Sequence, residues 1–282
     1  MPGTLFVVAT PIGNLEDITL RALRVLREVA VIAAEDTRRT ANLLARHAIV
    51  TSMTSLHEHN EVGKSAAIVG RLQRGEDVAL VSDAGTPTVS DPGGRLIRLA
   101  IVAGIRVEPI PGPSAVMAAL AVSGLSSDTF TFLGFPPTRS KDRKLWFLRL
   151  LDVGGVVVFF EAPHRVQKTL KTLLETVGDC DVTIARELTK IHEELVRGKI
   201  SSVLQSTRSW RGEFTVVVDI GYMTELNKDR GVDESALLVE FGEITENMAG
   251  SKRRVIAALA KRHGLPPNTV YGVVERAKKS VK

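Results

Sequence analysis

Four loops in the first 115 residues are rich in Gly, Pro, hydroxyl and acidic residues, and each follows a short apolar run. The longest covers residues 82–94 and reads Ser-Asp-Ala-Gly-Thr-Pro-Thr-Val-Ser-Asp-Pro-Gly-Gly; the others cover residues 10–14, 35–38 and 111–115. Proline stiffens such a loop, and glycine lets backbone amides and carbonyls come close to a ligand. A stiff polar loop of this kind suits a flat ligand without phosphates, such as an adenosine with an amino-acid tail.

Two common nucleotide motifs are absent from the chain. No G-x-G-x-x-G fingerprint follows the first apolar run, where Pro11 stands in place of the glycine that a close approach to pyrophosphate needs. No G-x-x-x-x-G-K-[ST] loop occurs either. Gly and Pro at strand ends are also ordinary turn residues, but four such loops together favour a ligand site.

The elements that must position these loops are short β-branched runs separated by amphipathic segments. The runs cover residues 5–9, 29–34, 78–82 and 107–110, and helical spacing of apolar residues appears at 19–28, 66–72 and 95–103. Alternation of strand and helix predicts a parallel sheet that is buried on both faces. Because ligands bind outside the carboxyl ends of parallel strands, the four loops are expected to form one polar edge.

A second set of elements follows Pro111-Gly112-Pro113. Strands are predicted at 129–133, 156–160, 182–185 and 214–220, and helices at 114–123, 143–151, 166–177 and 191–196. We therefore predict an α/β protein with two α/β domains, residues 1–112 with a parallel sheet and residues 113–222 with a mixed sheet. The second domain is expected to complete the ligand cleft.

The C-terminal part differs in charge and pattern. Residues 222–234 suggest a linker, and two apolar stripes, around Val255 and Val270, predict a small helical, helix-turn-helix-like domain at 235–282. Residues 251–282 contain nine Lys or Arg and one acid, whereas the rest of the chain has 28 bases and 31 acids. Such a tail favours a polyanionic partner, with Lys252, Arg253 and Arg254 as candidate RNA contacts; a solvated helical surface is the alternative.

Composition narrows the class of protein. The chain is 44% apolar and 24% charged, and no apolar run approaches the roughly 18 to 20 residues that span a bilayer. The N-terminus lacks a signal-peptide pattern, and a single Cys180 fits a reducing compartment, so we expect a cytoplasmic protein that contacts no membrane. Asp179 and Asp181 should raise the pKa of Cys180 and make it a poor nucleophile.

Several segments together resemble the ribosomal RNA small subunit methyltransferase I family, within the tetrapyrrole methylase superfamily. The resemblance covers nearly all of residues 1–221, and the basic tail is similar to the family's small C-terminal domain. The segments that carry it are residues 8–15, 35–38, 57–61, 82–94, 111–115, 134–137, 161–165, 185–190 and 212–214.

The resemblance implies two α/β domains with S-adenosyl-L-methionine in the cleft between them, in a homodimer. It also implies 2′-O-methylation of a cytidine ribose in the decoding region of 16S rRNA, within the 30S subunit. Carried over to this sequence, the cofactor-binding residues are Pro11, Asp83, Ala84, Gly85, Thr86, Pro87, Ser90, Asp91, Ser114, Ala115, Glu161, Glu187, Gly212 and Phe214.

A ribose hydroxyl is a poor nucleophile until its proton is removed, so a general base is sought. The catalytic candidates are Glu35, His57, Glu187 and Lys190, to which the sequence adds Asp36 and His59 without choosing among the six. His59 and Arg38 are also candidate RNA contacts. The stretch His-Glu-His-Asn-Glu at 57–61 matches no zinc spacing, so no metal is expected.

Two other functions remain open at this stage. A C-methyltransferase acting on tetrapyrroles is suggested by the superfamily, although the basic tail counts against it. A non-catalytic RNA-binding ribosome assembly factor is the second, and its cofactor loops would be degenerate, which these are not.

Overall fold

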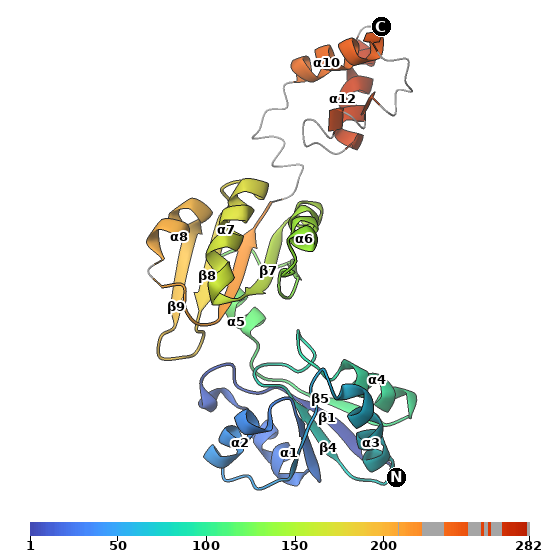
Figure 1. Ribbon diagram of the computed structural model, residues 1–282, viewed down its shortest axis with the longest axis vertical. Helices are drawn as coiled ribbons and strands as arrows, with labels where there is room; N and C mark the ends of the chain where they lie inside the picture. The colour runs from blue at the N-terminus through green and yellow to red at the C-terminus, as the bar shows by residue number, and fades with distance from the viewer. Residues whose placement is uncertain (208, 222–233, 248–254, 257–258, 261–266, 281–282) are drawn as a thin grey trace. The chain divides into compact units, whose positions relative to one another are not determined.

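We describe a computed structural model of the chain, which places residues 1–207, 209–221, 234–247, 255–256, 259–260 and 267–280 (Figure 1). The chain divides into two compact units, Met1–Gly221 and Tyr222–Lys282. Within the described residues no helix is long and apolar enough to cross a membrane. The boundaries at 112/113 and 235 remain predictions.

The first sheet is parallel, as predicted. Its strands run in the order β3-β2-β4-β1-β5, and β2 and β4 are buried along their whole length. Side chains alternate between the faces of β2, so that Ile32 packs with α1 and α2 while Val31 packs with α3 and α4 (Figure 1). The elements are β1 Thr4–Val8, η1 Leu15–Asp17, α1 Leu20–Glu28, β2 Val31–Ala34, α2 Thr37–Arg46, β3 Met53–Ser55, α3 Glu61–Gln73, β4 Val78–Val81, α4 Gly94–Val102 and β5 Arg106–Ile110.

Two elements of the first half of the chain, helix α2 and strand β3, were not predicted. Helix α2 begins with the polar run Thr-Arg-Arg-Thr, and it is positioned by Leu43 and Leu44 against the core and by Asp36, whose side chain caps its N-terminus. Strand β3 has only three residues and no β-branched apolar side chain, so nothing but its pairing with β2 defines it.

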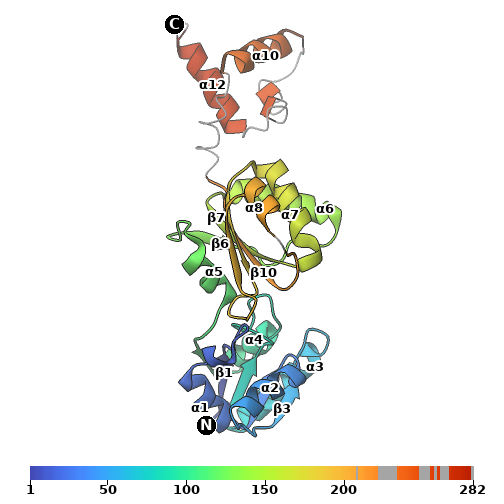
Figure 2. The same ribbon diagram turned by 90° about the vertical axis from the view of Figure 1, so that its left-hand side faces the viewer.

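The second sheet is mixed, as predicted, with the order β6-β7-β10-β8-β9 and a single parallel pair, β6 with β7, among the described strands. Helix α5 packs on one face around Leu120, and helices α6, α7 and α8 pack on the other around Phe159 (Figure 2). The elements are α5 Ala115–Ser123, β6 Phe130–Phe132, α6 Ser140–Val153, β7 Val156–Glu161, α7 Pro163–Val177, β8 Asp181–Arg186, β9 Glu194–Lys199, α8 Ile200–Ser206 and β10 Phe214–Asp219.

The predicted helix at 191–196 is wrong. Residues 194–199 form the edge strand β9, which pairs with β8 from Arg186↔Glu194 to Asp181↔Lys199. Leu195 packs against the core on the α5 face, and Val196 packs against the core on the opposite face. The short apolar segment therefore has the two-residue period of a strand, which six residues were too few to distinguish from a helical turn.

The second unit contains α10 Glu234–Asn247 and α12 Pro267–Ser280. A small core joins them through Leu237, Leu259, Val270 and Val273, so the two predicted apolar stripes are buried together. Lys252, Arg253 and Arg254, and most of the predicted turn at 263–268, lie outside the described residues. The fold is thus α/β, with two β-sheets that are each covered by helices, and a small C-terminal helical part.

Candidate functional site

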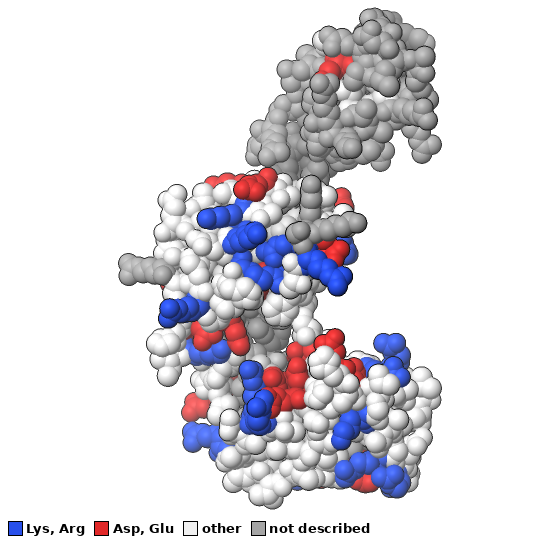
Figure 3. All heavy atoms as spheres, in the orientation of Figure 1, with Lys and Arg blue, Asp and Glu red and all other residues white. Residues whose placement is uncertain are grey.

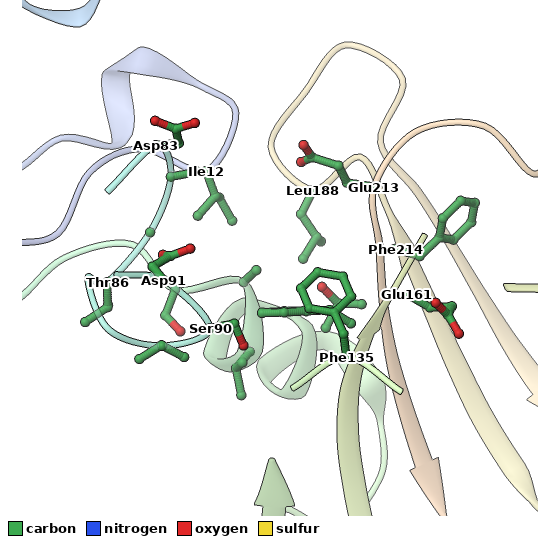
Figure 4. A pocket seen from close by; sticks show the side chains of 18 of the residues that line it. Ile12, Asp83, Thr86, Ser90, Asp91, Phe135, Glu161, Leu188, Glu213 and Phe214 are labelled. Atoms are coloured by element: carbon green, nitrogen blue, oxygen red, sulfur yellow. The ribbon is translucent and has the colours of Figure 1, made fainter. Parts of the chain in front are cut away.

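A cavity of about 430 Å³ lies between the carboxyl-end loops of the first sheet and the second sheet (Figure 4). Residues of the 82–91 loop and the start of α5 form one wall. Residues of β7, β8 and β10, of the turns that follow β6, β7 and β8, and of the turn before β10 form the other. This is the edge at which the sequence pattern predicts a ligand site.

The loop wall is held together by backbone contacts. The amides of Thr10 and Gly85 each donate to the other's carbonyl at 2.9 Å, and the Thr10 hydroxyl donates to the Ser82 carbonyl at 3.2 Å. Gly85 has φ +78°, a conformation that other residues rarely adopt. The Thr86 hydroxyl donates to the Pro113 carbonyl at 3.3 Å and thereby joins this loop to the one before α5. The chain therefore presents a preformed wall.

Carboxylates dominate the loop wall. A Glu35 carboxylate oxygen accepts from the Asp83 amide at 3.2 Å, and Asp83 in turn accepts from the Asp36 amide at 2.9 Å. Burial raises the pKa of Glu35, and burial together with the negative charges of Glu35 and Asp83 raises the pKa of Asp91 to about 6. The unit Met1–Gly221 has a first half, which holds the first sheet, and a second half, which holds the second sheet. Figure 3 shows acidic side chains gathered on the first half where it faces the second half. No Lys, Arg or His is among the described residues that line the cavity.

The opposite wall is largely apolar. Phe135 is 54% exposed, and its ring is tilted against Phe160 with the centroids 5.4 Å apart. In Figure 4 Phe135 and Leu188 extend from the second half toward the cavity. Gly134 accepts from the Phe160 amide at 2.9 Å, which fixes the turn that carries Phe135. A flat ring system would find apolar surface on this side.

Glu161 is turned away from the cavity (Figure 4). Its fully buried carboxylate lies 3.3 Å from Arg143 Nη2 and 3.1 Å from Arg165 Nε, and it accepts from the Ala162 amide at 2.9 Å and from the Thr169 hydroxyl. The Phe214 ring belongs to the core on the same far face. Both residues thus border the cavity through their backbone rather than their side chains.

Glu187 and Lys190 form a clamp at the rim. A Glu187 oxygen accepts from the Glu213 amide at 2.8 Å and from Lys190 Nζ at 3.0 Å, and Lys190 also reaches Glu213 at 2.9 Å. A Cβ on Gly212 would lie 2.6 Å from Glu187, which explains the glycine there. The Asn14 amide donates to the Thr189 hydroxyl at 2.9 Å, so the clamp also joins the two halves of the unit.

These contacts set the charges of the clamp. Burial raises the pKa of Glu187, but the Glu213 amide and the Lys190 ammonium outweigh it, so the pKa lies below its ordinary value. Burial lowers the pKa of Lys190, but its bonds to Glu213 and Glu187 outweigh it, so the pKa is raised. Lys190 therefore remains an ammonium ion, which is unsuited to accept a proton.

The predicted cofactor residues divide into two groups. Four of them do not line the cavity. Pro11 and Pro87 are buried within the loops, Glu187 belongs to the clamp, and Gly212 lies against the Glu187 side chain. Those that do line it are Asp83, Ala84, Gly85, Thr86, Ser90, Asp91, Ser114, Ala115, Glu161 and Phe214.

Of the six candidate bases, Glu35 alone lines the cavity. Asp36 is paired with Arg38, whose guanidinium bonds lower the Asp36 pKa to about 2. His57 follows the edge strand β3, where its Nε2 lies 3.0 Å from Asn60 Nδ2, and His59 is exposed beside it. Arg38 is 91% exposed. The structure therefore separates the histidines from the cavity wall.

The residues that sequence reasoning missed come mainly from the second half. Phe135 stands inside a segment that carried the family resemblance, but no role was assigned to it; Glu213 lies within the range 212–214 that the resemblance placed near the cofactor, and it does line the cavity. The others that line the cavity without having been predicted are Ile12, Val89, Val116, Phe160, Ala162, Pro163, Ala185, Leu188 and Thr215.

Neither metal nor thiol chemistry is indicated. Within the described residues no group of three His, Cys, Asp or Glu is placed to hold a metal ion. Burial, more than its acidic neighbours, raises the pKa of Cys180 to about 12, so the thiol is a poor nucleophile as predicted.

Comparison with known proteins defines the class of this fold and site. The family model of tetrapyrrole (corrin/porphyrin) methylases matches residues 4–204. Solved structures of diphthine synthase, with 14% identity, 77% of this chain and 90% of that chain covered and a TM-score of 0.62, and of uroporphyrin-III-C-methyltransferase from Thermus thermophilus, with 18% identity, 77% and 94% covered and a TM-score of 0.54, share the fold. The fold is that of the class III methyltransferases.

Close relatives narrow this class further. A protein of Halalkalibacterium halodurans named ribosomal RNA small subunit methyltransferase I is 40% identical, over 96% of this chain and 94% of its own length. A protein of Thermotoga maritima with the same name is 47% identical, over 77% of this chain and 98% of its own. The chain belongs to the ribosomal RNA small subunit methyltransferase I family of the tetrapyrrole methylases.

Proposed function

We propose that this chain uses S-adenosyl-L-methionine to methylate the 2′-oxygen of a cytidine ribose in the decoding region of 16S rRNA. The observation that carries the proposal is the charge of the cavity: Glu35, Asp83 and Asp91 line it, and no Lys, Arg or His does so among the described residues. Such a site suits a ligand that is cationic where it meets the carboxylates and that lacks phosphates.

The residues present fit this cofactor. The carboxylates of Asp83, Asp91 and Glu35 complement a sulfonium and an ammonium group. The apolar surface of Phe135 and its neighbours accommodates an adenine ring. The start of α5, capped by Ser114, offers backbone amides and a positive helix end to the amino-acid carboxylate.

The same charge argues against other ligands. ATP or a dinucleotide would bring phosphates against the acidic loop wall without a basic residue to receive them. A tetrapyrrole with carboxylate side chains would meet the same repulsion. The charge of the cavity thus favours methylation of rRNA over the tetrapyrrole reaction that the sequence left open.

In the proposed reaction the chain positions the acceptor and removes its proton. Bound S-adenosylmethionine supplies a methyl group that its sulfonium has already activated. Glu35 and Asp91 share the loop wall; burial raises the pKa of Asp91, and the negative charge of Glu35 raises it further. We assign Asp91, supported by Glu35, as the acceptor of the ribose hydroxyl proton, because a base works best with a pKa near the working pH. Asp91 is an addition to the predicted bases and takes the place of Lys190.

The RNA partner is supported by the names of the relatives and by the charge of the tail. Residues 251–282 contain nine Lys or Arg and one acid, and this positive charge suits contacts with phosphates. Assembly as a homodimer, a location in the cytoplasm and recognition of the 30S subunit belong to this proposal. The homodimer and the 30S subunit rest on the family resemblance, whereas the location rests on the single Cys180, which fits a reducing compartment.

Titration of the purified protein tests the cofactor assignment. Calorimetry should show binding of S-adenosylmethionine and no binding of ATP under the same conditions. Binding of ATP without binding of S-adenosylmethionine would contradict the proposed function.

Replacing Gly13 should disturb the clamp that closes the cleft. A Cβ at this position would lie 2.5 Å from the Lys190 side chain, 2.7 Å from the Thr189 hydroxyl and 2.8 Å from the Leu188 carbonyl. Gly13→Ala is therefore expected to displace one half against the other and to lower kcat/KM for RNA methylation about 10- to 100-fold. Gly63→Ala is the matched control, because nothing lies within 4 Å of its Cβ. Equal activity of the two variants would show that the clamp does not set the cleft.

A further inference from the structure

A second cavity, of about 590 Å³, adjoins the first. Its size is within the roughly 300–1,000 Å³ typical of small-molecule sites. Pro163 lines both cavities, so the two meet at the start of helix α7. The residues that line it are Pro163, His164, Gln167, Ser209, Trp210 and Arg211.

Trp210 offers a flat surface in this second cavity. Its partly buried ring is tilted by 30° against Phe214, with the ring centroids 6.3 Å apart. One side of the indole is thus supported by the protein core, while the ring also lines the cavity. Supported aromatic rings of this kind stack on nucleobases with little regard to sequence.

The second cavity also differs from the first in charge. Arg211 lines it and no Asp or Glu does so among the described residues, whereas carboxylates line the first. Arg186 Nη1 donates to the Arg211 carbonyl at 3.4 Å, and Arg186 Nε donates to Glu194 at 2.8 Å, so the backbone of this turn is fixed to β8 and β9. Helix α7 begins at Pro163 without an acid in its first turn. A phosphate is favoured here by the guanidinium.

We propose that the second cavity binds a nucleotide next to the methylated one in a single-stranded part of the RNA. The base stacks on Trp210, the phosphate binds Arg211, and Gln167 and His164 offer polar contacts to the base edge. The inference rests on the proposed function for the identity of the polymer. It assigns a part of the RNA contact to the first unit rather than to the basic tail.

Kinetics of RNA methylation test the assignment. Trp210→Ala should raise KM for the RNA about 5- to 100-fold, the range expected for loss of one base–aromatic stack, and should change kcat far less. Trp210→Phe, which keeps an aromatic ring, should leave KM for the RNA close to the wild-type value. Arg211→Ala should raise KM and reduce the slope of log KM against log salt by about one, and the exposed Lys171→Ala on α7 serves as the charge control. Gln167→Ala, at an exposed position, adds a variant that leaves the core intact.

Fluorescence gives a measurement that does not depend on methylation. The chain has two tryptophans, so Trp146→Phe leaves Trp210 as the sole one. A labelled single-stranded oligonucleotide with the 16S decoding-region sequence should bind to this variant and quench its fluorescence. Binding and methylation without quenching would overturn the second-cavity assignment alone. Failure of the wild-type protein to bind or methylate RNA would overturn the proposed function as well.

Two further outcomes would also overturn the assignment. If Trp210→Ala weakened the affinity for S-adenosylmethionine as much as that for RNA, the second cavity would be a part of the cofactor site. If the variants affected methylation of 30S subunits but not binding to the free oligonucleotide, this surface would contact a ribosomal protein instead.

Discussion

Asp91→Asn is expected to lower kcat for RNA methylation about 100- to 10,000-fold, the usual contribution of a general base. The amide keeps the shape of the side chain but cannot take up the proton of a ribose hydroxyl. Because Asp91 also belongs to the acidic wall, the affinity for S-adenosylmethionine should fall to a smaller extent. Asp128→Asn, which removes an exposed acid outside the cavity, should leave kcat unchanged.

The same substitution should stabilise the protein at neutral pH. Burial raises the pKa of Asp91 from 3.8 to about 6, so the folded state binds this proton more tightly than the unfolded state. The stability contributed by the protonated carboxyl is fully present below the unfolded pKa of 3.8 and is lost as the pH rises through about 6. At pH 7 Asn avoids the burial of a charge, and we expect a gain on the order of 1 kcal/mol after allowing for solvent screening.

The pH dependence of kcat/KM checks both halves of this prediction. In the wild type, kcat/KM should rise with pH and level off above about 6, as Asp91 loses its proton. Glu35→Gln should move the midpoint to lower pH, because the charge of Glu35 contributes to the raised pKa of Asp91. A variant Asp91→Asn that remained active, or a wild-type profile without this midpoint, would remove Asp91 from the catalytic role.

Glu161→Gln is expected to destabilise the chain by about 3 to 5 kcal/mol, as removal of one partner from a buried ionic group does. The side chain of Glu161 is fully buried, and Arg143 and Arg165 are 13% and 17% exposed. Burial lowers the pKa of Arg143, a sign that its charge is already costly to hold there. Without the carboxylate, two guanidinium groups remain close together with no opposite charge between them.

Urea unfolding measures this effect. The midpoint should fall while the m-value stays constant, and the exposed Glu175→Gln on α7 should behave as the wild type does. Arg165 also donates to the carbonyls of Pro136 and Pro137, in the turn that carries Phe135, so affinity for the cofactor should fall as well. A loss of less than about 1 kcal/mol would mean that the arginines are screened or find other partners.

The fold could be predicted where local pattern decides it. Strands β2 and β4 are continuous apolar runs, and β7 is one as far as Phe160, because both faces of each sheet are covered; such runs are visible in the sequence. Strand β9 could not be recognised, since only its pairing with β8 distinguishes a half-exposed strand from a short helix. Helix α2 was missed for a related reason: its buried Leu43 and Leu44 follow a polar first turn.

The site could be predicted in part. The loops of the first half follow strands whose direction is known, so their meeting at one edge required only the parallel topology. The second wall depends on the register of β7 and β10, which turns Glu161 and Phe214 away from the cavity. The pairing of Glu187 with Lys190 likewise depends on the turn after β8, where Glu187 has φ +51°.

The most direct test of the proposed function is transfer of a labelled methyl group from S-adenosylmethionine to 30S subunits that lack the modification, followed by mapping of the modified nucleotide. We expect one methyl group on the 2′-oxygen of a single cytidine in the decoding region, and none on a tetrapyrrole offered in a parallel reaction. A methyl group on a base carbon or nitrogen, or on the tetrapyrrole alone, would contradict it.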